Sequence, residues 1–181
     1  MDQRHLEFLE GTRRLAAMRS RALFIGAAMA VFAMLSAAPL SAAELIGPAR
    51  VIDGDTLEIQ GQRIRLYGID APESRQYCVA GNTEYPCGAM ATSWVAAMTL
   101  GHEIRCEGDK KGKYGRLLAI CFVADKNLNS GIVRAGWALA YTRYSSDYLD
   151  AQAIAARDHL GIWAGKFTPP WEWRKRKRAR K

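Results

Sequence analysis

Alternating apolar and polar residues along the first part of the chain predict three β-strands. They are ELIGPARVID (44–53), DTLEIQ (55–60) and QRIRLYGI (62–69), with tight turns expected at Gly54 and around Gly61. Two later runs have the same strand-like character, HEIRCEG (102–108) and GRLLAICFVAD (115–125). The pattern therefore predicts five short strands.

Helical spacing of apolar residues appears in three other segments. Residues 88–101 place apolar side chains close to a helical period and end at Gly101, which can terminate a helix. A short helix is expected to start near Asn129, and a longer amphipathic one over 147–163 to close at Gly161. Five strands with about three helices predict a small α+β domain built around an antiparallel barrel. The three tryptophans of this region, Trp94, Trp137 and Trp163, are expected to pack its core.

The N-terminal segment has a different character. Residues 22–35 form an uncharged run that follows Arg19 and Arg21 and precedes small residues, which is typical of a secretory signal cleaved after Ala43. A retained membrane anchor is the alternative, although Pro39 interrupts the apolar stretch. The leading residues are long for a signal, so we expect translation to start at Met18. The predicted organisation is a signal peptide over 1–43, one domain over 44–167 and a basic tail over 168–181.

Export changes the interpretation of the four cysteines. An even number of cysteines in an oxidising compartment favours disulfides over a metal site. Three pairings are possible, and we favour Cys78–Cys87, which bracket a polar loop, with Cys106–Cys121, which lie in neighbouring strand-like runs. Zinc is the less favoured alternative, because no CxxC pair or nearby histidine is present. The expected location is secreted or periplasmic.

The net charge of +8 is distributed unevenly. The terminal WEWRKRKRARK (171–181) carries seven bases and one acid, whereas 44–170 has equal numbers of acids and bases. Basicity alone therefore does not make the central domain a nucleic-acid binder. For the tail two interpretations remain open, a solvated terminus or a tether for polyanions.

Acidic residues gather around the first three predicted strands. Asp53 and Asp55 are two residues apart and can point to the same side, and Asp70 and Glu73 follow the third strand. If these strands are neighbours, their oxygens converge, and such hard ligands suit Ca²⁺ or Mg²⁺. Arg65 lies on the strand that leads to Asp70, and an arginine beside a bound cation fits a phosphate diester.

Four motifs in order resemble the staphylococcal nuclease family. They are VIDGDTLEI, RLYGIDAPE, KYGRLLAICFV and HLGIW, within residues 50–163. The resemblance implies an OB-fold barrel and a Ca²⁺-dependent nuclease, with Mg²⁺ as a possible substitute. It implies metal ligation by Asp55 and Asp70 with Asp53 in support, a general base at Glu73, and phosphate binding by Arg65 and Arg116. Lys113, Tyr114, Tyr141 and Tyr144 are the implied substrate-binding residues. The implied partner is DNA or RNA. We expect a monomer without a stable protein partner, and contact with a membrane only if the N-terminal segment is retained.

The chain departs from the family pattern near the expected site. Ala71 replaces the usual threonine after the metal-binding aspartate, and Gly112 stands where an acid often precedes KYGR. The segment with Cys78 and Cys87 is an insertion that we expect to restrict or tune substrate access. Two other function classes remain: a barrel that binds nucleic acid without cleaving it, and an envelope protein anchored by its N-terminal segment. A pure binder has no reason to keep the acids near a phosphate, and an envelope protein would leave the whole acid and arginine set without a role.

Overall fold

The first predicted strand is broken at Ala49, and its two halves pair with opposite ends of one sheet. This arrangement is found in a computed structural model that describes residues 44–180, so the predictions for the signal segment, its cleavage site and Met18 lie outside the described residues. β1 (Glu44–Pro48) pairs with β8 (Glu103–Lys111), and β2 (Arg50–Asp53) pairs with β3 (Thr56–Ile59). The chain itself thus joins the two edges of the sheet.

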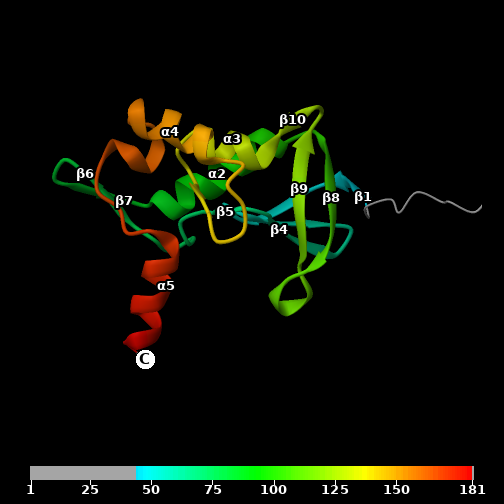
Figure 1. Ribbon diagram of the computed structural model, residues 1–181, viewed down its shortest axis with the longest axis horizontal. Coiled ribbons are helices and arrows are strands. Elements are labelled where there is room, and N and C mark those ends of the chain that lie inside the picture. Colours follow the sequence, from blue (N-terminus) through cyan, green and yellow to red (C-terminus); the bar gives the residue numbers. More distant parts are fainter. Residues whose placement is uncertain (1–43, 181) are drawn as a thin grey trace, which may run out of the picture. The chain divides into compact units, whose positions relative to one another are not determined.

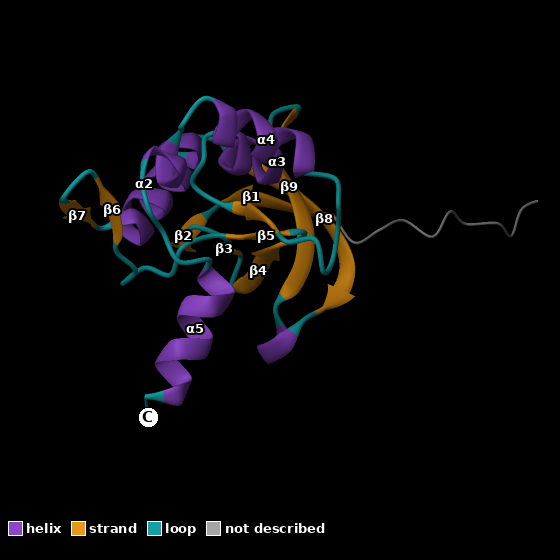
Figure 2. Cartoon of the chain, turned by 60° about the vertical axis from the view of Figure 1, so that its left-hand side comes forward, coloured by secondary structure: helices purple, strands orange, loops and turns teal. Residues whose placement is uncertain are grey.

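The main sheet has the strand order β1-β8-β9-β4-β3-β2. β4 (Gln62–Leu66) is antiparallel to β3 and parallel to β9 (Leu117–Val123), while β9 is antiparallel to β8. The short β10 (Lys126–Asn127) pairs with β9. Figure 2 shows these strands curling around a common centre, and the expected α+β architecture of the OB-fold kind is confirmed. The expectation of a purely antiparallel barrel is wrong, because β4 and β9 are parallel.

Two of the predicted strands have different limits in the structure. The third ends at Leu66, and the chain turns at Gly68 before the separate strand β5 (Ile69–Asp70), which pairs with β11 (Leu139–Ala140). The fourth continues to Lys111, because β8 and β9 form a long hairpin closed by the 3₁₀ turn η1 (Lys113–Gly115). The described chain therefore has more strands than the predicted five, and most of them, although not β8, are shorter than predicted.

Three helices cover one side of the sheet. α2 (Cys87–Thr99) packs against β2, α3 (Leu128–Arg134) packs against β9, and α4 (Leu149–Arg157) packs against α3 (Figure 1). The predicted long helix is wrong at its C-terminal end, since α4 stops at Arg157 and a 3₁₀ turn, η2 (Gly161–Ala164), follows. A fourth helix, α5 (Pro170–Ala179), lies within the basic tail and extends away from the other three.

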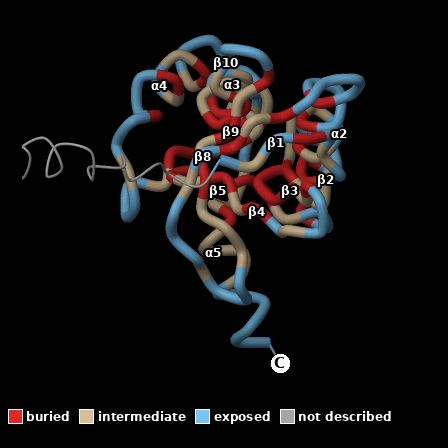
Figure 3. The backbone as a smooth tube through the Cα atoms, turned by 90° about the vertical axis from the view of Figure 1, so that its right-hand side faces the viewer, coloured by how far each residue is buried: buried red, intermediate tan, exposed pale blue. Residues whose placement is uncertain are grey.

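The core fills the space between the sheet and these helices (Figure 3). Its buried side chains include Leu57, Ile64, Leu66, Ile104 and Ile132. Trp94 and Trp137 pack against this core, and Trp163 packs against a smaller buried cluster around Cys78 and Cys87, so the packing predicted for all three is confirmed. Among residues 44–180, no helix is both long and apolar enough to cross a membrane.

Both predicted disulfides are present. Cys106–Cys121 links β8 to β9 at directly paired positions. Cys78–Cys87 links β6 (Cys78–Ala80), which forms a hairpin with β7 (Thr83–Tyr85), to the first residue of α2. One bridge therefore lies inside the barrel, and the other fastens the inserted hairpin to a helix.

Candidate active site

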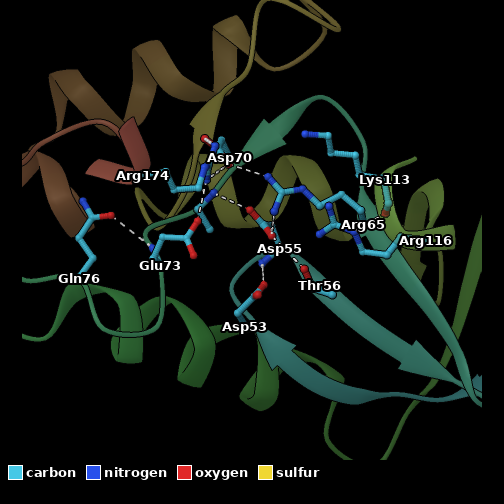
Figure 4. Close-up of polar contacts among 11 residues, drawn as sticks. Asp53, Asp55, Thr56, Arg65, Asp70, Glu73, Gln76, Lys113, Arg116 and Arg174 are labelled. Carbon is cyan, nitrogen blue, oxygen red and sulfur yellow. Dashed lines mark hydrogen bonds and ion pairs between the residues drawn. The ribbon is translucent and has the colours of Figure 1, made fainter. Parts of the chain in front are cut away.

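Two buried aspartates share one arginine at the centre of the site (Figure 4). Asp55 immediately precedes β3 and Asp70 ends β5, and both side chains are almost fully buried. Arg65 lies on β4, opposite Thr56, so the strand pairing brings it beside Asp55. Its Nη1 donates to Asp55 Oδ1, and its Nη2 donates to Asp70 Oδ1 at 2.6 Å. The structure therefore brings Asp55, Asp70 and Arg65 together, as the sequence predicted.

Backbone contacts fix the turn that carries Asp55. Asp53 Oδ1 accepts a hydrogen bond from the Asp55 N–H at 3.0 Å, and Asp55 Oδ2 accepts one from the Ala71 N–H at 2.9 Å. A Cβ on Gly54 would lie 2.8 Å from that of Ala71, so only glycine allows the turn to approach the loop after Asp70 this closely. Asp53 thus supports the turn, and Ala71 contributes its backbone to the site.

The environment of Asp55 favours its protonated form. The pKa of the Asp55 carboxyl is raised from 3.8 to about 8, chiefly because burial disfavours the charged form. The carboxylates of Asp53 and Asp70 act in the same direction, whereas the Arg65 guanidinium and the Ala71 N–H oppose them. Additional positive charge near Asp55 would therefore be stabilising.

Glu73 is held by its own loop and by α2. Its N–H donates to the side-chain oxygen of the buried Gln76 at 3.3 Å, and Gln76 Nε2 donates to the Thr168 carbonyl at 2.6 Å. A Cβ on Gly88 would lie 1.8 Å from the Glu73 carbonyl oxygen, so glycine is required where α2 meets this loop. Gly88 follows Cys87, and the disulfide therefore fastens the element against which the Glu73 loop rests.

A cavity of about 450 Å³ opens beside these acids. Its wall includes Asp53 and Glu73, and it carries all six of the predicted basic and aromatic site residues: Arg65, Lys113, Tyr114, Arg116, Tyr141 and Tyr144. Lys113 and Arg116 come from the end of the β8–β9 hairpin, and Figure 4 places them on the side of Arg65 away from Glu73. The inserted hairpin of β6 and β7 is not part of the cavity wall, so the expectation that it limits access finds no support in this geometry.

The tyrosines of the cavity differ in how much of each ring is free to contact a ligand. Tyr114 and Tyr144 are exposed, and Arg116 lies over the Tyr114 ring with its guanidinium carbon 5.9 Å from the ring centre. Tyr141 already stacks on Trp171, with ring centres 5.4 Å apart. One face of Tyr141 is therefore covered by α5, which the sequence did not indicate.

Arg174 was missed by the sequence analysis. It lies on α5, and its guanidinium bonds to both Asp70 and Glu73. Arg178, one helical turn later, also lines the cavity. The only sequence signal was the run of seven bases, which did not distinguish these two from their neighbours. The tail is thus an ordered helix that reaches the acids.

Comparison with known proteins agrees with this geometry. A family model described as "Staphylococcal nuclease homologue" matches residues 63–165. The chain belongs to the staphylococcal nuclease family. It is 39% identical over 144 residues to the "Succinoglycan biosynthesis protein ExoI" of Rhizobium meliloti (strain 1021), covering 77% of this chain and 74% of that protein. It is 34% identical over 148 residues to an "Uncharacterized endonuclease" of Escherichia coli O157:H7 (77% and 91%) and 32% identical over 145 residues to the "Micrococcal nuclease" of Shigella flexneri (70% and 78%).

The arrangement of the acidic side chains bears on whether they could hold a hard divalent cation. Asp55 and Asp70 bind the same guanidinium, so their oxygens already converge on one positive group. As the side chains stand, no three Asp, Glu, His or Cys residues within 44–180 form a ready arrangement for a metal ion, because Asp70 and Glu73 are directed at arginines. The carboxylate oxygens are donors of the kind that a hard divalent cation prefers, and Arg65 and Arg174 supply the positive charge in this arrangement.

Replacing Asp55 should show how much stability the folded protein loses by burying the charge of this carboxylate. We expect Asp55→Asn to gain stability relative to the native protein as the pH rises. Above pH 3.8 the unfolded carboxyl is ionised while the folded one keeps its proton up to about 8, so the native protein loses stability across this range and the asparagine variant does not. The gain at pH 8 should exceed that at pH 5 by at least about 1.4 kcal/mol, the equivalent of one pKa unit.

Urea unfolding at both pH values, with EDTA present, measures this difference. Asp125→Asn is the control, because Asp125 lies in an exposed turn and its substitution should show no such pH dependence. A gain for Asp55→Asn that is the same at pH 5 and pH 8 would contradict the expected cost of the charge.

Proposed function

We propose that this protein is a nuclease that hydrolyses phosphodiester bonds of DNA or RNA with the help of Ca²⁺, with Mg²⁺ as a possible substitute. The observation that carries the proposal is the division of the cavity wall. Carboxylates from Asp53 and Glu73 lie on one side and cations from Lys113 and Arg116 lie on the other, while the buried Asp55 and Asp70 bond to Arg65, which also lines the cavity. Hydrolysis of a phosphate diester needs both groups: carboxylates to activate water, and cationic donors for the negative oxygens of the phosphate.

The residues divide the chemistry according to their exposure. Glu73 retains 35% of its side-chain surface, so its carboxylate can reach a water molecule and accept a proton from it as general base. Asp55 and Asp70 are buried and suit the holding of a cation, supported by Asp53. When bound, such a cation neutralises the diester and makes the attacking water more acidic.

The arginines and tyrosines receive the substrate. Arg65 and Arg116 supply planar guanidinium groups that can bind phosphate in a bidentate manner and stabilise the charge that develops on phosphorus. Lys113 adds a further positive charge. Tyr114 and Tyr144 present exposed rings for a base or sugar, and stacking of this kind tolerates any sequence. Tyr141 offers only the surface that Trp171 leaves uncovered.

Removing the proton acceptor tests the proposed chemistry. With both disulfides intact, the protein should cleave single-stranded DNA, duplex DNA or RNA in Ca²⁺ or Mg²⁺ and not in EDTA. Glu73→Gln keeps the shape of the side chain but removes its basicity, so turnover should fall by about 10² to 10⁴. Gel assays with labelled oligonucleotides measure the rates.

The matched control is Glu84→Gln, an exposed position on the β6–β7 hairpin that should retain full activity. Binding without cleavage in any metal would instead indicate a nucleic-acid-binding module. Equal loss in both variants would show that the effect is not specific to the site.

The basic helix α5 is proposed to extend the substrate surface. Arg178 lines the cavity, whereas Arg176 on the same helix does not. A base that contacts a phosphate releases counterions, so Arg178→Gln should weaken single-stranded DNA binding and lower the slope of log K against log salt by about 0.7. Arg176→Gln removes the same charge and should change the slope less.

Fluorescence anisotropy in EDTA, at several salt concentrations, measures both variants without cleavage. Identical slopes and affinities for Arg178→Gln and Arg176→Gln would mean that α5 contributes only its overall charge.

We also propose that the protein is exported through the segment 1–43. Two disulfides support this, because such bonds persist in oxidising compartments. N-terminal sequencing of the protein recovered outside the cytoplasm should begin at Glu44. A chain recovered from membranes with its N-terminal segment intact would favour the anchored alternative.

A further inference from the structure

Arg174 forms ion pairs with Asp70 and Glu73, two carboxylates that the proposed chemistry needs (Figure 4). Its Nη1 donates to Asp70 Oδ1 at 3.0 Å and to Glu73 Oε1 at 2.7 Å, while its Nη2 donates to Asp70 Oδ2 at 2.8 Å. The guanidinium thus holds Asp70 through both oxygens and ties Glu73 to it. This is the fork geometry in which arginine binds carboxylates most strongly.

These contacts leave Asp70 with few free acceptor sites. Its side chain is fully buried, Oδ1 accepts from Arg65 as well as Arg174, and Oδ2 accepts from Arg174. A divalent cation that bound Asp70 would meet a resident positive charge at the same oxygens. A divalent ion at these oxygens would be repelled by the Arg174 guanidinium, so each disfavours the presence of the other.

We propose that Arg174 is an internal cation that competes with the divalent ion for Asp70 and Glu73. The metal concentration at which the site fills is then set by α5. This inference rests on the proposed metal-dependent function, but it concerns a residue outside the four motifs, on a helix beyond the family match at 63–165.

The surroundings of Arg174 allow it to leave the acids without disturbing the core. The helix is anchored at its start, where Pro170 is buried and Trp171 stacks on Tyr141. Arg174 is half-buried, and residues 175–180 are exposed. The side chain can therefore turn into the adjacent cavity, which it already lines, while the anchored first turn stays in place.

Competition of this kind has a predictable size. If the acids are free of Arg174 for only about one tenth of the time, the apparent dissociation constant for the ion is about ten-fold higher than that of the free site. Removing the guanidinium should recover this factor. Substitution by lysine keeps the charge and loses the fork, so its effect separates geometry from simple charge repulsion.

Calcium titration of the metal-free protein, without substrate, tests the competition. By isothermal titration calorimetry, Arg174→Gln should bind Ca²⁺ about ten-fold more tightly than the native protein, and Arg174→Lys should fall between the two. Arg176→Gln removes the same charge from the exposed part of α5 and should change the affinity less than about two-fold. Circular dichroism checks folding, and Arg174→Lys serves if the glutamine variant fails to fold.

Hydrogen exchange gives a reciprocal measurement. Because the coupling is mutual, saturating Ca²⁺ should increase exchange of the α5 amides in the native protein and leave that of Arg174→Gln unchanged. Calcium affinity in Arg174→Gln that is equal to or weaker than native would overturn the competition, and metal-dependent cleavage would then leave the nuclease proposal standing. Absence of Ca²⁺ binding in every variant, together with absence of cleavage in any metal, would overturn both.

Discussion

The burial of carboxylates beside one arginine is the constraint on which the rest of this structure depends. Asp55 and Asp70 are removed from water and lie against Arg65, and the fold must provide enough positive charge and N–H groups to keep them there. Isolated buried charges are far more costly than paired ones. The pKa of Asp55, raised chiefly by burial, shows that the pairing offsets only part of this cost.

The barrel brings these groups together from three directions. The β3–β4 hairpin supplies Asp55 and Arg65, the chain after the turn at Gly68 supplies Asp70 and Glu73, and the end of the β8–β9 hairpin supplies Lys113 and Arg116. The strands of both hairpins are interior strands of the main sheet, whose edges are β1 and β2. Strand pairing therefore positions Arg65 and Asp70, whereas Asp55, Glu73, Lys113 and Arg116 lie in the turns and loops next to the strands.

Local patterns were sufficient to predict most of the strands, the disulfides and the acid cluster, because each depends on residues close in sequence or on alternation along a strand. The break at Ala49 was not predicted, since both halves have the same apolar alternation and only their partners differ. The early end of α4 was missed because its apolar pattern continues into a turn. Arg174 could not be distinguished within a run of bases, because its partners, Asp70 and Glu73, lie about a hundred residues earlier.

The inserted hairpin is not part of the cavity wall, yet hydrogen bonds and a disulfide connect it to the residues of the site. Val79 and Lys166 exchange two backbone hydrogen bonds, and Gln76 bonds to both the Glu73 loop and Thr168, just before α5. The Cys78–Cys87 bridge thus braces Glu73 and the base of α5 together, whereas Cys106–Cys121 braces the barrel. Reduction of the first bond would loosen a proton acceptor and its neighbouring arginine at once while sparing the sheet. Loss of the Cys78–Cys87 bond would thus affect the site without removing a support of the barrel.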